Sequence, residues 1–183
     1  RARCSLVAAA ALPNLRQTVR PSVCVPTRPT SAQRMLGSSN MDSSSPAKHK
    51  QIIERCYRAI CEGTWEVLDE AAAADYAYQD PAQPNVRTWP EHRAQMRGLS
   101  LAIPDLRFDI DDIIAEGDRV AVRWTMRGTH TGPALLMGLS ATGASVETQG
   151  LSLYHMVGGR VARAYTVSDM LGLMHQLRAK QKE

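Results

Sequence analysis

Two pairs of acidic and imidazole side chains in this sequence have the chemistry for proton transfer. The segment 150–169, GLSLYHMVGGRVARAYTVSD, holds His155 and Asp169. The second pair is Asp80, in YAYQDP, and His130, in RGTHTG. A carboxylate and an imidazole act as general acid and base only where both reach one substrate. The elements that carry each pair therefore decide whether it can form a site.

The first pair lies in a predicted β-hairpin, and its two side chains are expected to be far apart. Runs rich in Val, Leu, Tyr and Thr flank a Gly-Gly pair, which is typical of a hairpin turn. With a three-residue loop, VGG, His155 faces Val161, and a two-residue loop, GG, moves its partner to Ala162. Asp169 lies eight residues beyond Val161, about 26 Å along the strand. We therefore assign Asp169 as the N-cap of a short helix, MLGLMHQL.

Three helices are predicted in the first part of the domain, from caps and from apolar residues spaced at 3.6. The first spans residues 45–63, between a capping Ser-Pro pair and a glycine. The second opens at Thr64 and runs through WEVLDEAAA to end near DYAYQDP. The third opens at Thr88 with TWPE, which has capping-box spacing, and ends before Pro104.

The apolar period then changes to two, which predicts strands. RFDIDDII and RVAVRWTMRGTH read as two antiparallel strands, and the hairpin adds two more. Between them, the loop 131–143 has an apolar middle that could fold over the mouth of a pocket. Three helices, four antiparallel strands and a last helix indicate an α+β domain whose helices pack on one face of a curved sheet.

The positive charge of the chain is concentrated before the domain. The net charge is +4, yet residues 1–41 contain six Arg and no acidic residue, so the rest of the chain has 16 Lys plus Arg against 18 Asp plus Glu. A basic folded face is therefore not expected, and we exclude nucleic-acid binding. The apolar run of residues 6–12 is too short to span a membrane.

The same N-terminal segment is rich in Arg, Ser, Thr, Pro and Ala, a composition typical of organelle transit peptides. We predict a disordered tail over residues 1–44, a folded domain over residues 45–183, and a destination in the chloroplast or mitochondrion. If Met41 is the true start, the protein is expected in the cytoplasm.

The two cysteines of the domain indicate neither a disulfide nor a metal site. Cys56 and Cys61 are five positions apart on the first predicted helix, so they point about 140° away from each other. No spacing of Cys, His or acidic residues is typical of metal ligands. We therefore expect no metal.

Four segments together carry a family resemblance: ADYAYQDP, PDLRFDIDDIIAEGDRVAVRW, RGTHTG and DMLGLMHQL. With them the chain resembles the SnoaL-like polyketide cyclases, of the nuclear transport factor 2-like superfamily, over residues 48–178. The resemblance implies a small cone-shaped α+β domain, often homodimeric, whose sheet and helices enclose a deep apolar cavity. It also implies aldol ring closure without a cofactor, by one carboxylate in a dry pocket.

The catalytic carboxylate that the resemblance implies is missing at its expected position. Aligned through the GGRV turn and the DMLG helix start, the family's aspartate falls at Thr166, and the polar residues of the neighbouring strand fall at Gly150 and Ser152. A threonine hydroxyl cannot accept a proton from carbon at neutral pH.

The other candidate site residues carry less specific chemistry. With Thr166 facing the cavity, the three-residue loop pairs it with Gly150 and places Ser152 and Tyr154 on the same side, so we predict these four as substrate-binding residues. Tyr78 joins them at the mouth of the cone in the family pattern. Two candidate catalytic residues, Asp80 and His130, are predicted near that mouth. A turn role for Asp80, a loop role for His130 and a core role for Tyr154 remain open.

The sequence thus predicts a domain that binds a small apolar or polyketide-like molecule. One alternative is a cofactor-independent cyclase or isomerase that uses Asp80 and His130. Another is a homodimeric interaction scaffold. A homodimer is expected through the outer sheet face, to which we assign Trp124, Tyr165 and Val167.

Overall fold

The computed structural model describes residues 45–180, so the predicted tail and transit peptide lie outside the described residues. Within this range the chain forms an α+β domain, as predicted. In chain order the elements are α1 (Pro46–Glu62), α2 (Trp65–Ala71), β1 (Ala72–Gln79), α3 (Trp89–Ala102), β2 (Arg107–Glu116), β3 (Arg119–Thr129), β4 (Ser145–Val157), β5 (Arg160–Ser168) and α4 (Met170–Lys180).

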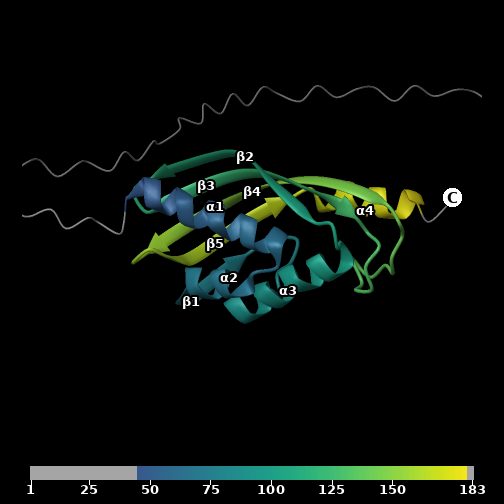
Figure 1. Ribbon diagram of the computed structural model, residues 1–183, viewed down its shortest axis with the longest axis horizontal. Helices are drawn as coiled ribbons and strands as arrows, with labels where there is room; N and C mark the ends of the chain where they lie inside the picture. Colours follow the sequence, from purple (N-terminus) through teal and green to yellow (C-terminus); the bar gives the residue numbers. More distant parts are fainter. Residues whose placement is uncertain (1–44, 181–183) are drawn as a thin grey trace, which may run out of the picture. The chain divides into compact units, whose positions relative to one another are not determined.

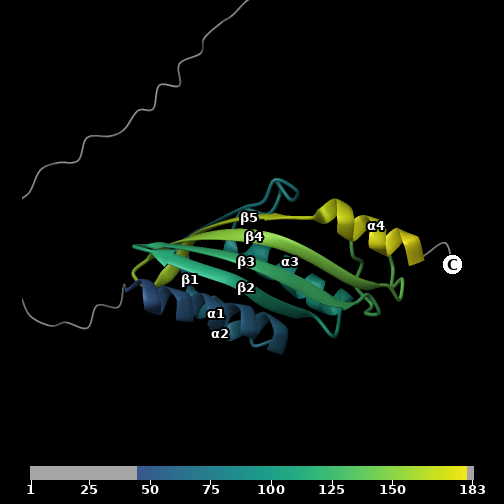
Figure 2. The same cartoon turned by 90° about the horizontal axis from the view of Figure 1, so that it is seen from above.

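The strands form one curved sheet in the order β1-β5-β4-β3-β2. The pair β1 and β5 is parallel, and the other neighbours are antiparallel. Helix α1 contacts β2 and β3, while α2 and α3 contact β1. Figures 1 and 2 show these three helices on one side of the sheet and α4 following β5 at its end. The predicted layer arrangement is confirmed, and it leaves a space between the helices and the sheet.

The predicted helix ends are confirmed by their caps. The Ser45 hydroxyl accepts the Lys48 N–H at 3.3 Å, and Gly63 ends α1 in the left-handed region with φ 71°. The Glu91 carboxylate accepts the Thr88 N–H at 2.9 Å at the start of α3. Each bond satisfies a backbone group that the helix itself leaves unpaired.

The segment that follows α2 was predicted wrongly. Residues 72–79 form the strand β1, so the sheet has five strands rather than four. Alanine has the highest helix propensity, which is why WEVLDEAAA predicts a longer helix. Tyr76 and Tyr78, two apart, are both buried on the inner face, and backbone pairing with β5 accompanies that burial. Tertiary packing outweighs the local preference here.

The hairpin turn is the tighter of the two forms considered. Gly158 and Gly159 alone join β4 to β5, with φ 57° and 75°, a pair of conformations that only glycine adopts at no steric cost. One extra residue in β5 then shifts the register, so His155 pairs with Arg163. The three-residue loop is therefore wrong, and so is the pairing of His155 with Val161 or Ala162.

This register also corrects the partner of Thr166. Thr166 pairs with Ser152 rather than with Gly150, and Gly150 pairs with Ser168. The predicted facing survives this change, because a shift of two residues keeps each side chain on its own face. Ser152 and Thr166 consequently lie side by side on the inner face.

Candidate functional site

The inner face of the sheet and the helices enclose a cavity of about 620 Å³. Every main layer of the domain contributes to its walls. The lining residues are Tyr57 and Ile60 of α1; His92, Gln95, Met96, Gly98 and Leu99 of α3; Tyr78, Phe108, Trp124, Met126, Thr148, Ser152, Tyr154, Thr166 and Ser168 of the sheet; Asp80, Ala82, Gln83, Leu135, Leu136 and Met137 of the loops; and Met170, Leu173 and Met174 of α4. Three residues of the loop 131–143 are among them, in agreement with its predicted place over the pocket.

The back of the cavity is a chain of neutral hydrogen-bonding groups. The indole N–H of Trp124 donates to Ser152 Oγ at 3.0 Å, and Ser152 Oγ lies 2.9 Å from Thr166 Oγ1. The indole can only donate, so the Ser152 hydroxyl is free to donate its hydrogen bond to Thr166. The Thr166 hydroxyl can then donate a hydrogen bond to a ligand. Ser152 and Thr166 thus both lie where the sequence predicts them.

Two of the cavity's phenols form a second neutral pair. The hydroxyls of Tyr57 and Tyr154 lie 3.0 Å apart. Burial raises the pKa of Tyr57, Tyr78 and Tyr154, so all three stay protonated at neutral pH. They offer hydrogen bonds to a ligand and no charge.

Asp80 is the one carboxylate among the described residues that line the cavity. It is buried, and its two oxygens accept the Ala82 N–H at 2.8 Å and the Gln83 side-chain N–H at 3.2 Å. The bond to Ala82, two residues on, is that of an Asx turn. Gln83 in turn accepts a short hydrogen bond from Gln95 of α3. Asp80 therefore ties the turn after β1 to the wall of the cavity.

His130, the other predicted catalytic residue, is not among the lining residues. It is fully buried, and its Nδ1 lies 3.2 Å from the Thr142 hydroxyl and 3.4 Å from the Thr142 N–H. Its backbone also pairs with Gly143 and Ala144. No contact joins Asp80 to His130 in the described part of the chain. His130 thus holds the end of the loop 131–143 in place, and the structure does not bring the predicted acid–base pair together.

Gly150, a predicted binding residue, takes no part in the lining. A Cβ at this position would collide with the six-membered ring of Trp124. The missing side chain lets that indole lie flat across β4 and reach Ser152. Gly150 therefore shapes the cavity indirectly.

The first pair considered, His155 and Asp169, is separated as predicted. His155 Nε2 bonds to Asp118 at 2.7 Å on the outer side of the sheet. Asp169 Oδ1 accepts the Gly172 N–H at 2.8 Å, which caps α4. Neither side chain lines the cavity.

One cavity residue that could do chemistry was not predicted from the sequence. His92, in the first turn of α3, has its Nδ1 2.7 Å from the Tyr76 hydroxyl and its ring stacked on Tyr78 at 3.9 Å. Burial lowers the pKa of His92 to about 4, so the ring is neutral at pH 7. A signal was available, because His92, Gln95, Met96 and Leu99 follow helical spacing and form one face.

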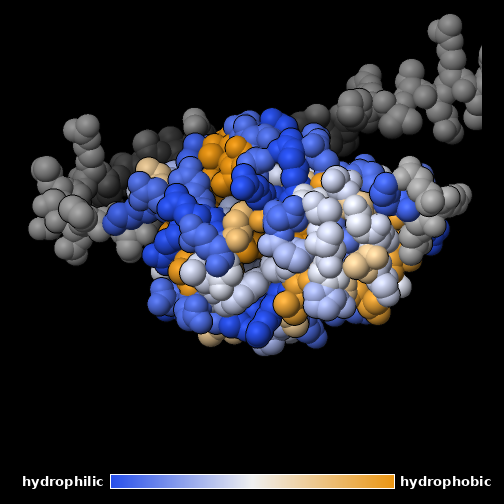
Figure 3. Space-filling model, turned by 45° about the vertical axis from the view of Figure 1, so that its right-hand side comes forward, coloured by the Kyte–Doolittle hydropathy of each residue, from blue (hydrophilic) through white to orange (hydrophobic). Residues whose placement is uncertain are grey.

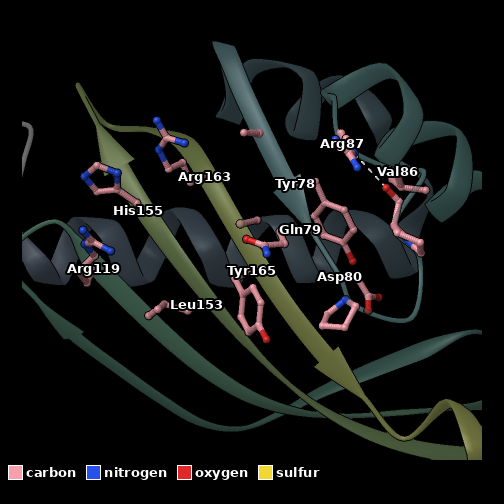
Figure 4. Close-up of a pocket in the computed structure, with 14 residues that line it drawn as sticks. Tyr78, Gln79, Asp80, Val86, Arg87, Arg119, Leu153, His155, Arg163 and Tyr165 are labelled. Carbon is pink, nitrogen blue, oxygen red and sulfur yellow. Dashed lines mark hydrogen bonds between the residues drawn. The ribbon is translucent and has the colours of Figure 1, made fainter.

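A second hollow, of about 570 Å³, lies on the outer side of the sheet. Figure 4 shows Arg119, His155 and Arg163 together at one end, on three adjacent strands, and Tyr165 nearer the middle, close to Gln79. At the other end the Arg87 Nε–H donates to the Pro84 carbonyl at 3.0 Å. Arg163 has no ion-pair partner in the described part of the chain. We call this hollow the outer groove.

Two further features bear on ligand classes. Among residues 45–180, no group of three or more His, Cys, Asp or Glu side chains is placed to hold a metal ion. Within the same residues, no helix is both long enough and apolar enough to cross a membrane.

The fold and the cavity define a class of protein. The family model of the SnoaL-like polyketide cyclases matches residues 50–177, so the chain belongs to that family. Its five-stranded curved sheet with four helices is the nuclear transport factor 2-like cone fold. The predicted family and fold are confirmed.

Several solved structures are similar to this chain. TsrD from Streptomyces laurentii is 29% identical, with a TM-score of 0.66, over 74% of this chain and 98% of that one. IdmH from Streptomyces antibioticus, a candidate polyketide cyclase, is 27% identical, with a TM-score of 0.63, over 71% and 98%. AclR from Streptomyces galilaeus, a candidate hydroxylase, is 26% identical, with a TM-score of 0.66, over 74% and 83%. No curated protein matches the chain.

Proposed function

We propose that this protein binds a small, mainly apolar, polyketide-like molecule in the cavity between the sheet and α3. The observation that carries the proposal is the character of the walls. Aromatic, methionine and leucine side chains make up most of the lining. A few neutral hydroxyls lie among them and are held by hydrogen bonds to each other and to Trp124. Such a pocket binds by burial of apolar surface and uses a few hydrogen bonds to set orientation.

Family membership supports the same class of ligand. The names of the similar proteins include a candidate polyketide cyclase and a candidate hydroxylase. The adaptable side chains of Met96, Met126, Met137, Met170 and Met174 suit a ligand that is rigid and apolar.

Native mass spectrometry of the protein purified from the cell that produces it tests this proposal. A retained small molecule should be found with wild-type protein. Gly98 lines the cavity, and a Cβ added there meets no atom within 4 Å, so Gly98→Leu should fill the space and abolish retention. The matched control is Ala94→Leu, on the exposed side of the same helix. Equal retention by Gly98→Leu and wild type would contradict the proposal.

Cofactor-independent cyclase or isomerase chemistry is the second candidate function. It is favoured by the position of Asp80, which puts a carboxylate at the cavity wall. Asp80→Asn should then abolish turnover of a polyketide ester, while Gln79→Glu, on the outer face next to it, should not. Retention of a ligand by the wild type without any turnover would leave binding as the function.

A homodimer through the outer sheet face remains a proposal, with one correction. Trp124 is buried and faces the cavity, so it cannot belong to that face. The face of the domain in Figure 3 is mostly hydrophilic, with its hydrophobic residues in small separate patches. Strands β4 and β5 expose five large apolar side chains: Leu151, Leu153, Val157, Tyr165 and Val167.

Sedimentation tests the dimer. Wild-type protein should sediment at about twice the chain mass, and Leu153→Lys should give a monomer because a charge replaces apolar contact area. Leu101→Lys is the control, since Leu101 is exposed on α3, away from that face. A wild-type monomer at all concentrations would contradict the dimer and leave the cavity proposal untouched.

A further inference from the structure

The two nitrogens of His92 lie in different surroundings. Nδ1 is 2.7 Å from the hydroxyl of Tyr76, a buried residue of β1. Nε2 has no hydrogen-bond partner among the described residues, yet it is not one of the two buried polar atoms that lack a partner there. Nε2 therefore keeps some accessible surface, and His92 is one of the residues that line the cavity.

Tyr76 fixes which nitrogen carries the proton. Burial raises the pKa of Tyr76 far above its usual range, so its hydroxyl keeps its proton and needs an acceptor. Among the described residues, the only acceptor within reach is Nδ1 of His92. If Nδ1 carried the proton instead, the buried hydroxyl would be left without an acceptor, which is unfavourable for a buried donor. The imidazole is therefore in the form with hydrogen on Nε2.

The ring cannot easily turn away from this orientation. It stacks on Tyr78 with an interplanar angle of 16°, and the edge of Trp89 approaches it with ring centroids 6.1 Å apart. Tyr76 and Tyr78 are two apart on β1, so both lie on the inner face and both contact the imidazole of His92. Three aromatic neighbours and one hydrogen bond thus set the direction of Nε2–H.

We infer that Nε2–H of His92 is a preset hydrogen-bond donor for a ketone or enolate oxygen of the ligand, and that Tyr76 is its positioning residue. The inference rests on the proposed function, because it needs a ligand in the cavity. It narrows the substrate class to apolar molecules that present a carbonyl oxygen towards the first turn of α3. A neutral imidazole that donates from Nε2 cannot also accept a proton there, so His92 stabilises charge on oxygen and is not the base that deprotonates carbon.

The tautomer can be measured without any ligand. Nitrogen NMR of protein with isotope-labelled histidine should show Nε2 protonated and Nδ1 unprotonated for His92 at pH 7. Tyr76→Phe should give a mixture of the two forms, because it removes the donor to Nδ1. A wild-type ring protonated on Nδ1 would overturn the inference, whatever the cavity binds.

Two probes of nearly equal shape test the ligand contact. 9-Fluorenone carries a ketone that fluorene lacks, and their affinities can be compared by quenching of tryptophan fluorescence. Wild-type protein should prefer the ketone by roughly fivefold, the value of one neutral hydrogen bond. His92→Phe, which keeps a ring for stacking, should lose that preference and still bind fluorene. His175→Phe, at an exposed histidine of α4, is the matched control.

The outcomes separate the two proposals. Binding of both probes with equal affinity by the wild type, or a ketone preference that survives in His92→Phe, would overturn the role of His92 while apolar binding stands. Binding of neither probe would remove the proposed function, and the inference would fall with it. The NMR result does not depend on the folding of any variant.

Discussion

The cavity and the outer groove share Tyr78 and Asp80 and several strands, yet only the groove is lined by arginines. Thr166 and Ser168 of β5 face the cavity, while Arg163 and Tyr165 of the same strand face the groove. Successive side chains of a strand point to opposite faces, so a single segment serves two environments. Alternate residues of β5 therefore form one wall of the cavity and one wall of the groove.

Charge separates the two hollows most clearly. The groove holds Arg87, Arg119 and Arg163, whose heads reach water. The cavity has no arginine or lysine among its described lining residues, and its imidazole is neutral. Removing a charge from water without a partner is costly, and the three arginines avoid that cost because each is an exposed residue.

Stability should depend far more on the cavity wall than on the groove. Trp124 is 7% exposed, donates to Ser152 and meets Phe108 edge to face at 5.3 Å. Trp124→Ala should lower the free energy of unfolding by about 3–5 kcal/mol. Tyr165→Ala, at a groove residue that is 39% exposed, should lower it by roughly 1 kcal/mol or less. Urea unfolding measures both, and equal losses would show that the outer face is as tightly packed as the cavity.

Lowering the pH should reduce the stability of the protein because the imidazole of His92 is buried. The pKa of His92 is about 4 in the folded protein and 6.5 in the unfolded chain, so between these values only the unfolded chain binds the proton. The free energy of unfolding should therefore fall as the pH drops from 6.5 to 4, by about 3 kcal/mol for this one group. Above pH 7 the group should have no effect. Tyr76 and Tyr78, which contact the ring, stay protonated throughout.

The difference between wild type and His92→Phe isolates this contribution, since other acids titrate equally in both. Thermal melts at half-unit steps of pH give the curves. Parallel curves between pH 6.5 and 4 would show that His92 is hydrated and protonates as readily as a histidine on the surface.

A carboxylate introduced at Thr166 tests how the neutral wall of the cavity tolerates a charge. In Thr166→Asp a carboxyl group lies next to Ser152 in the neutral wall, so we expect a loss of about 1–3 kcal/mol in stability at pH 7 and a raised pKa. A gain of aldol cyclisation of a polyketide ester should accompany it if the cavity admits that substrate, because a base within about 3 Å of the C–H is the missing element. Thr148→Asp, elsewhere on the inner face, is the control for charge alone. Activity equal to the wild type in a folded, ligand-binding Thr166→Asp would contradict this account.

Periodicity and capping predict most of the fold of this chain. The strict alternation of Val120, Val122, Trp124 and Met126 predicts the strand β3, and the structure buries all four. The same approach fails at β1, because a run of alanines carries no period and its strand character comes only from pairing with β5. Local preference is a weak guide where a distant segment supplies the hydrogen bonds.

The candidate site residues also divide into those that strand alternation places and those that depend on contacts with a distant segment. Ser152, Tyr154 and Thr166 are placed in the cavity by strand alternation alone, which a register error of two residues does not disturb. His92 depends on Tyr76 and Tyr78 of β1, so it could not be recognised while that segment was read as the end of a helix. The assignment of Trp124 to the outer face was wrong, because Trp124 alternates in step with Val122 and Met126 and lies on their buried face. The missing side chain of Gly150 makes room for its indole there.

The smallest effect is expected at Asp169, which caps α4 and lines neither hollow. Its carboxylate accepts the Gly172 N–H, and its backbone carbonyl accepts the Leu173 N–H at 3.1 Å and the Thr148 hydroxyl at 3.0 Å. An asparagine keeps one side-chain oxygen and caps helices about as well, so Asp169→Asn should change the free energy of unfolding by no more than a few tenths of a kcal/mol. Asp169→Ala should cost about 1 kcal/mol by the same reasoning, and both variants should retain the cavity ligand. Loss of retention or turnover in folded Asp169→Asn would mean that its charge acts on the cavity, and that the boundary drawn between cap and site is wrong.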